Sequence, residues 1–165
     1  MRKIGFCGGS SLCELGSASD VELFFDCIEY FAVKKYPHLN WTVLTDRLYR
    51  RYLRYEEIVV AEDLMRQVQA IFTMQPSSEV NWKQELVGDT EMTLLDPNQS
   101  NLGEVFSAYF ERFHYCVESA QVFMTTWKIY QPIKTVPTDL SGFAKERTRP
   151  PEDYDSLSGK PFWLC

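Results

Sequence analysis

The clearest local signal in the chain is the stretch 16–36, GSASDVELFFDCIEYFAVKKY, which predicts a long helix. Ser19 is followed three residues later by Glu22, the capping-box spacing that satisfies backbone N–H groups at a helix start. Behind this cap, apolar residues recur at three- and four-residue steps and therefore share one face: Val21, Phe24, Phe25, Ile28 and Phe31. Pro37 ends the pattern. We expect this aromatic face to anchor the hydrophobic core.

The size and composition of the chain indicate one folded domain. It has 165 residues, of which 45% are hydrophobic and 15% aromatic. A chain of this kind buries a core without disulfides and is not disordered. It contains no run of roughly eighteen apolar residues, so we expect no ordinary membrane-spanning helix. The apolar run near the start is broken at Gly8, which is atypical of a signal peptide, and we predict a cytoplasmic protein.

The cysteine pattern indicates free thiols. Five cysteines occur without a CxxC pair: Cys7, Cys13, Cys27, Cys116 and Cys165. An odd number without paired spacing is atypical of a disulfide framework or a zinc site. Glu111 and His114 form one ExxH pair, whereas a di-iron site requires a second. We therefore expect no catalytic residue, no cofactor and no metal ion, and we predict that the protein is not an enzyme.

The remaining segments predict a small sheet and three more helices. Residues 3–7 form a short apolar run that predicts a strand. Gly8-Gly9 follows it without the lysine and serine of a phosphate-binding loop, which favours a tight turn. Residues 122–130 are rich in β-branched and aromatic side chains and predict another strand. Apolar periodicity predicts further helices at three places: from residue 41, over 56–74, and from Asn101.

The predicted fold class is α+β, a single compact domain over residues 1–165 with a small β-sheet packed against about four helices. Residues 85–101 are polar and rich in turn formers, which predicts a long loop. The chain becomes proline-rich after residue 131. We expect residues 131–165 to form an irregular C-terminal tail packed on the body.

Charge is distributed unevenly along the chain, whose net charge is −6. Basic residues concentrate in residues 34–54 and acidic residues in 84–122. An acidic segment attracts basic partners and repels nucleic acid. Within residues 47–55 arginines alternate with tyrosines, a pattern that suits nucleic acid. The same pattern arises when a helix packs its tyrosines inward, or when its arginines pair with the acids of residues 56–63.

A resemblance to a known family rests on residues 4–31, IGFCGGSSLCELGSASDVELFFDCIEYF. They resemble bacterial immunity proteins of polymorphic-toxin and contact-dependent growth-inhibition systems, and are similar to the family called immunity protein seventy. The shared features are a strand, a Gly-Ser turn, a GSxS element and a helix that opens with Phe24-Phe25. The likeness continues to Trp82 and returns in the tail, where residues 149–163 read RPPEDYDSLSGKPFW. These motifs are structural and do not mark a binding site.

The resemblance implies a protein that binds one toxin domain, often a nuclease, in a one-to-one complex and blocks it in the cytoplasm of the producing cell. Acidic side chains accelerate association with a basic partner. The predicted toxin-binding surface is therefore the acidic loop and fourth helix, with Asp89, Glu91, Asp96, Glu104, Glu111 and Glu118. A second choice is the acidic tail segment, with Glu152, Asp153 and Asp155. A small nucleic-acid-binding or small-ligand-binding domain remains the alternative, although the negative net charge disfavours nucleic acid as a partner.

Overall fold

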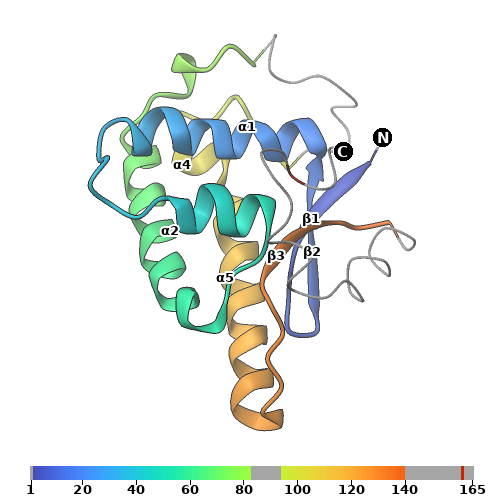
Figure 1. Cartoon of the computed structure of the whole chain (residues 1–165). Coiled ribbons are helices and arrows are strands. Elements are labelled where there is room, and N and C mark those ends of the chain that lie inside the picture. Colours follow the sequence, from blue (N-terminus) through green and yellow to red (C-terminus); the bar gives the residue numbers. More distant parts are fainter. Residues whose placement is uncertain (1, 83–93, 140–160, 162–165) are drawn as a thin grey trace.

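The chain folds as a small antiparallel sheet packed against helices (Figure 1), and the computed structural model describes residues 2–82, 94–139 and 161. The strands lie in the order β2-β1-β3, with bounds Lys3–Gly8 (β1), Ser11–Ser17 (β2) and Lys134–Pro137 (β3). The longer helices are Ala18–Ile28 (α1), Ile58–Thr73 (α2) and Ser107–Val122 (α5). Shorter helical segments are Glu29–Val33 (η1), Val43–Leu48 (η2), Tyr55–Glu57 (η3), Ser77–Glu79 (η4), Leu102–Val105 (α4) and Phe123–Trp127 (η6). The predicted α+β class is confirmed.

Strands β1 and β2 form a hairpin whose two-residue turn is Gly9-Ser10, directly after Gly8 at the end of β1. Gly9 has a φ of 58°, a left-handed conformation that glycine adopts without strain. The predicted tight turn is therefore confirmed. Strand β2 pairs with β1 from Gly8 opposite Ser11 to Lys3 opposite Ser17, with one irregularity where Leu15 has no partner.

The prediction of an irregular tail from residue 131 onward is wrong for its first part. Residues 134–137 form β3, which pairs antiparallel with β1, so that Ile4 lies opposite Pro137. The Thr135 hydroxyl also donates to the Leu48 carbonyl oxygen at 2.8 Å, which ties β3 to η2. Proline is tolerated in β3 because this strand lies at an edge of the sheet. Residues 140–160 and 162–165 lie outside the described residues.

The start of the first helix lies two residues before its predicted position. The capping box is formed by Ser17 and Asp20, and not by Ser19 and Glu22. The Asp20 N–H donates to the Ser17 hydroxyl oxygen at 3.2 Å, and the Ser17 N–H donates to the Asp20 carboxylate at 3.1 Å. Both pairs have the required spacing, but β2 ends at Ser17 and the chain turns directly into α1 there.

Replacement of Ser17 by alanine is expected to destabilise the protein by about 1 kcal/mol, because it removes the cap of α1. The measurement is chemical denaturation of the purified protein. Ser19→Ala is the matched control, since Ser19 lies inside the helix and its removal is expected to change stability by less than about 0.5 kcal/mol. Equal losses in the two variants would contradict this assignment of the cap.

The strand predicted over residues 122–130 is also wrong. Helix α5 runs to Val122 and continues as the wider helical turns of η6. Within them the Thr125 hydroxyl donates to the carbonyl oxygen of Gln121, a contact typical of threonine in helices. Lys128, with a φ of 56°, ends the helix. The helix therefore continues against the β propensity of this stretch, which is a weak local preference.

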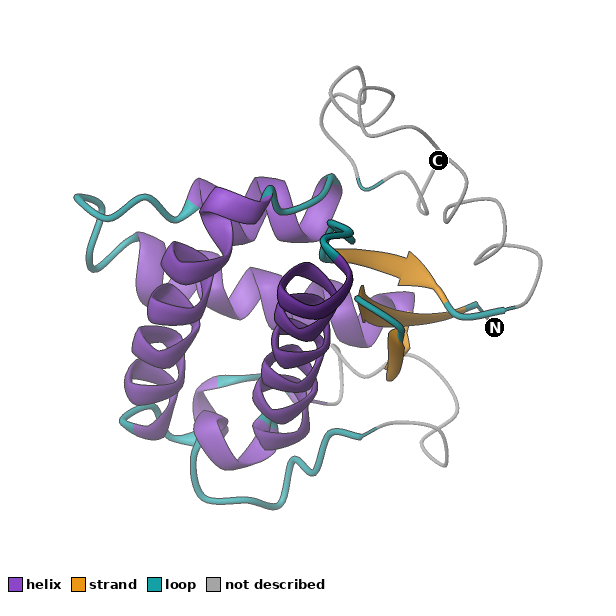
Figure 2. Cartoon of the chain, turned by 90° about the horizontal axis from the view of Figure 1, so that it is seen from below, coloured by secondary structure: helices purple, strands orange, loops and turns teal. Residues whose placement is uncertain are grey.

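The core forms where the predicted aromatic face of α1 meets α2 and α5. Phe24 is fully buried, and five aromatic rings lie around it with centroids 4.9–6.1 Å away: Phe25, Phe72, Phe106, Tyr109 and Phe110. One turn further along the same side of α5, Phe113 packs edge-on against Phe6 of β1 at 5.8 Å. Figure 2 shows the sheet at one side of the group of helices. Helix α5 therefore joins the sheet to the helical core and leaves its outer face exposed.

Candidate functional site

The outer side of α5 presents apolar side chains between acidic ones. Tyr115 is 59% exposed and Val122 is 55% exposed, and Glu111 and Glu118 are exposed beside them. The four residues recur at steps of three and four and so lie on one side of the helix. We call Glu111, Tyr115, Glu118 and Val122 the α5 face. Exposed aromatic side chains of this kind supply a large part of the binding energy in protein complexes.

A hollow of about 290 Å³ lies between the α5 face and the β1–β2 turn. Its walls include Tyr115, Glu118 and Val122 from α5, and Ser10 and Ser11 from the hairpin. The hairpin is held against the helix, because the Ser10 N–H donates to the Ser119 hydroxyl oxygen at 3.2 Å. The α5 face is therefore hollowed along one side, which suits a protruding side chain of a partner.

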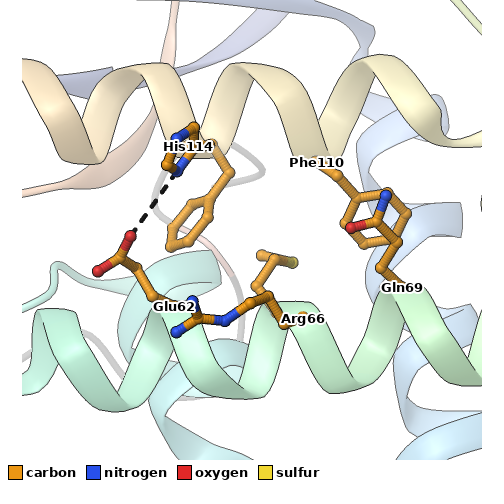
Figure 3. Close-up of a pocket in the computed structure, with 7 residues that line it drawn as sticks. Glu62, Arg66, Gln69, Phe110 and His114 are labelled. Atoms are coloured by element: carbon orange, nitrogen blue, oxygen red, sulfur yellow. Dashed lines mark ion pairs between the residues drawn. The ribbon is translucent and has the colours of Figure 1, made fainter.

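A second pocket, of about 150 Å³, lies between α2 and α5. Figure 3 shows Glu62, Arg66 and Gln69 on α2 facing Phe110 and His114 on α5. Met65 and Phe113 complete the lining. This pocket, which we call the α2–α5 pocket, has an apolar floor and a polar rim.

His114 connects the α2–α5 pocket to the α5 face. Its Nδ1 lies 3.7 Å from Glu62 Oε1, and its Nε2 lies 3.4 Å from Glu118 Oε1. One imidazole thus lies between a carboxylate of α2 and a carboxylate of α5. Glu62 could not be assigned to this group from local sequence, because the contact depends on how the two helices pack.

The structure brings together only some of the predicted acidic residues. Glu111 and Glu118 share the α5 face, whereas Glu104 lies on α4 and accepts a hydrogen bond from the Ser100 hydroxyl at 3.0 Å. Asp96 holds a turn by accepting from Gln99 Nε2 and the Asn98 N–H, and these bonds, above all that from Gln99, lower its pKa. The other candidates lie outside the described residues: Asp89, Glu91, Glu152, Asp153 and Asp155.

Sequence reasoning missed Tyr115, the most exposed aromatic residue of the α5 face. A detectable signal was present, since an aromatic residue between two glutamates at helical spacing faces away from an apolar stripe. The same reasoning treated His114 and Glu111 as one ExxH pair. In the structure the carboxylates near His114 are instead Glu62 and Glu118.

The basic segment uses part of its charge in internal contacts. Arg47 Nε lies 3.3 Å from Glu57 Oε1, and Arg51 Nε lies 3.3 Å from Asp46 Oδ2. The segment also turns aromatic rings inward, because Tyr49 is buried and stacks on Phe25 with centroids 4.1 Å apart. These contacts therefore fit the interpretations in which the tyrosines of this segment pack inward and its arginines pair with acids better than they fit a nucleic-acid surface.

The buried thiol nearest the sheet has no features of a nucleophile. Cys116 is fully buried, and its thiol donates to the Phe6 carbonyl oxygen at 3.4 Å. Burial raises the pKa of Cys116, which keeps the thiol protonated, whereas a catalytic cysteine requires a thiolate. Within residues 2–82 and 94–139, no three potential metal ligands gather at one point.

Comparisons with known proteins leave the site to be judged on its own chemistry. No protein-family model, curated protein or solved structure matches the chain. In the part of the chain that the structure describes, no helix has the length and apolar character needed to cross a bilayer. A further hollow of about 300 Å³ is lined by Asp26, Tyr30 and Glu79 among others. The functional argument is built on the α5 face, because two hollows adjoin it.

Proposed function

We propose that the protein is an immunity protein, which binds and neutralises one cognate toxin domain of a contact-dependent growth-inhibition or related polymorphic-toxin system. The toxin domain is a basic protein, a nuclease, held in a one-to-one complex in the cytoplasm. The resemblance of residues 4–31 supports this class. The observation that carries the proposal is the α5 face, where an exposed tyrosine lies between two carboxylates and an exposed valine follows one turn later.

The chemistry of the α5 face suits a basic protein partner. Tyr115 offers a large rigid ring and a hydroxyl, the combination enriched at the centres of protein interfaces. Glu111 and Glu118 place negative charge on either side of it, which speeds encounter with a positively charged partner. The net charge of −6 acts in the same direction. Neutralisation in this proposal takes place by binding and requires no reaction.

The experiment is co-expression with the C-terminal domain of an exoprotein encoded immediately upstream. We expect cells to survive only when this protein is present, and the two proteins to purify as a one-to-one complex. Killing without rescue, together with no association at low salt, would overturn the proposal for that pair.

Tyr115→Ala is expected to weaken the complex by about 30-fold, because it removes the aromatic anchor of the α5 face. Tyr30→Ala is the matched control, since Tyr30 is also 59% exposed but lies on η1. Its affinity is expected to stay within about threefold of the parent protein. Isothermal titration of both variants with the toxin domain checks this, and equal effects would exclude the α5 face as the contact surface.

A nucleic-acid-binding role is less well supported. Arg47 and Arg51 already form ion pairs with Glu57 and Asp46. Binding of duplex or single-stranded DNA that weakens steeply with salt would favour this role instead.

A further inference from the structure

We propose that the α2–α5 pocket is a receptor for one cationic side chain, an arginine or a lysine, of the protein partner. This inference rests on the proposed function, because it names the group by which a basic toxin domain is held. The pocket adjoins the α5 face through His114 and Glu118, so one partner surface reaches both.

The floor of the pocket fits the aliphatic part of such a side chain. Met65, Phe110 and Phe113 are buried and apolar. Arginine and lysine lay their methylene groups along surfaces of this kind and keep the charged group at the rim. The volume of about 150 Å³ suits one side chain, whereas sites for drug-sized ligands measure about 300–1,000 Å³.

The rim supplies a carboxylate, Glu62, for which the described residues provide no hydrogen bond. The Glu62 side chain is only 20% exposed, and its one ion-pair contact in the described part of the chain is His114 Nδ1 at 3.7 Å. That distance is longer than a hydrogen bond. A partly buried carboxylate is stabilised when donors reach it. A guanidinium or ammonium group entering the pocket supplies such donors, and Glu118 beyond His114 adds a second negative charge.

Arg66 also lines the pocket, and its positive charge opposes a cationic occupant. Substitutions of Glu62 and Arg66 therefore distinguish a cationic occupant from an anionic one. Arg66 lies four residues after Glu62 and is exposed. A cationic occupant is attracted by Glu62 and repelled by Arg66, whereas an anionic occupant experiences the reverse. The two classes of occupant thus predict opposite responses to the same pair of substitutions.

The first experiment uses n-butylguanidinium as the probe, with n-butyrate as its anionic counterpart. The full chain is labelled with ¹³C at the methionine methyl groups. Met65 in the floor reports binding, and Met74, at the end of the same helix and 80% exposed, reports non-specific effects. We expect n-butylguanidinium to shift the Met65 methyl signal saturably while Met74 stays unchanged, and n-butyrate to shift neither. A response to n-butyrate alone, or no Met65 response to either probe, would overturn the proposal.

The second experiment repeats the titration with two variants. Glu62→Gln is expected to weaken n-butylguanidinium binding about tenfold, the scale of one lost charged hydrogen bond. Arg66→Gln is expected to strengthen it about two- to threefold, the scale of an exposed charge–charge interaction. Glu29→Gln, an exposed glutamate on η1, is the control and is expected to leave binding unchanged. Unchanged n-butylguanidinium binding in Glu62→Gln, or weaker binding in Arg66→Gln than in the parent protein, would overturn the cation site.

Measurements on the toxin complex then distinguish a failure of this inference from a failure of the proposed function. Neutralisation that survives Glu62→Gln with unchanged affinity would contradict the pocket and leave the immunity role standing. A Met65 response without any toxin binding would support the cation chemistry and contradict the immunity role.

Discussion

Replacing Phe24 by alanine is expected to lower the free energy of unfolding by about 3–5 kcal/mol, the range measured for large aromatic truncations in protein cores. Phe24 is fully buried, and its ring lies within 4.9–6.1 Å of five others contributed by α1, α2 and the segment from residue 106 to α5. These neighbours are held by separate elements, so they cannot collapse together into the space that the ring leaves.

Urea denaturation of the two purified proteins measures this loss. The matched control is Tyr30→Ala, since Tyr30 follows the same helix but is 59% exposed, and a change below about 1 kcal/mol is expected. Phe24→Leu is expected to fall between the parent and Phe24→Ala, because it keeps part of the buried volume. A loss below about 1 kcal/mol for Phe24→Ala would mean that the aromatic cluster is not the centre of the core.

Replacing Gly9 by alanine is expected to destabilise the protein by about 2–5 kcal/mol, for two independent reasons. A side chain at a φ of 58° costs about 1–2 kcal/mol. A Cβ at this position would also lie 2.5 Å from the backbone carbonyl of Ser119, and such overpacking typically costs about 1–3 kcal/mol. The hairpin turn would have to move away from α5.

Thermal or urea unfolding checks this prediction, with Ser10→Ala as the control. Ser10 is the neighbouring turn residue and is exposed, and its contact to Ser119 uses the backbone N–H, which alanine retains. The control is expected to stay within about 0.5 kcal/mol of the parent. Comparable stability of both variants would show that the turn does not press on α5.

Local periodicity was sufficient to predict the helices of the core. The apolar faces of α1 and α2 occupy the expected positions, since Phe24, Phe25, Val68 and Phe72 are all buried. The start of α1 was harder, because Ser17–Asp20 and Ser19–Glu22 have the same spacing. The pairing of β2 with β1 up to Ser17 decides between them, and that pairing is a tertiary contact.

The segments after α5 could not be predicted from local sequence. Residues 123–127 have strand-forming side chains, yet they continue a helix that is already nucleated, and extension of a helix is easier than its initiation. Strand β3 contains a proline and only four residues, which gives little local signal. Its place is fixed by β1, at the other end of the chain.

For the candidate site, the sequence predicted which acidic residues of α5 contribute, but not which residues of other elements lie beside them. Glu111 and Glu118 were identified, and their common face follows from helical spacing. Glu62 comes from α2, and its approach to His114 depends on the packing of two helices separated by a long stretch of chain. The apolar floor of the α2–α5 pocket likewise consists of residues that periodicity assigns to the core.

The position of β3 has a consequence for the order in which the protein assembles during synthesis. The central strand β1 is among the first residues made, but its second neighbour begins at residue 134. At about 5–20 residues per second, roughly 120 residues separate the completion of the hairpin from the arrival of β3, a delay on the order of 10 s. During that interval β1 presents an open edge, which other extended chains can join. Nascent chains that end before residue 134 therefore carry an aggregation hazard that the finished fold removes.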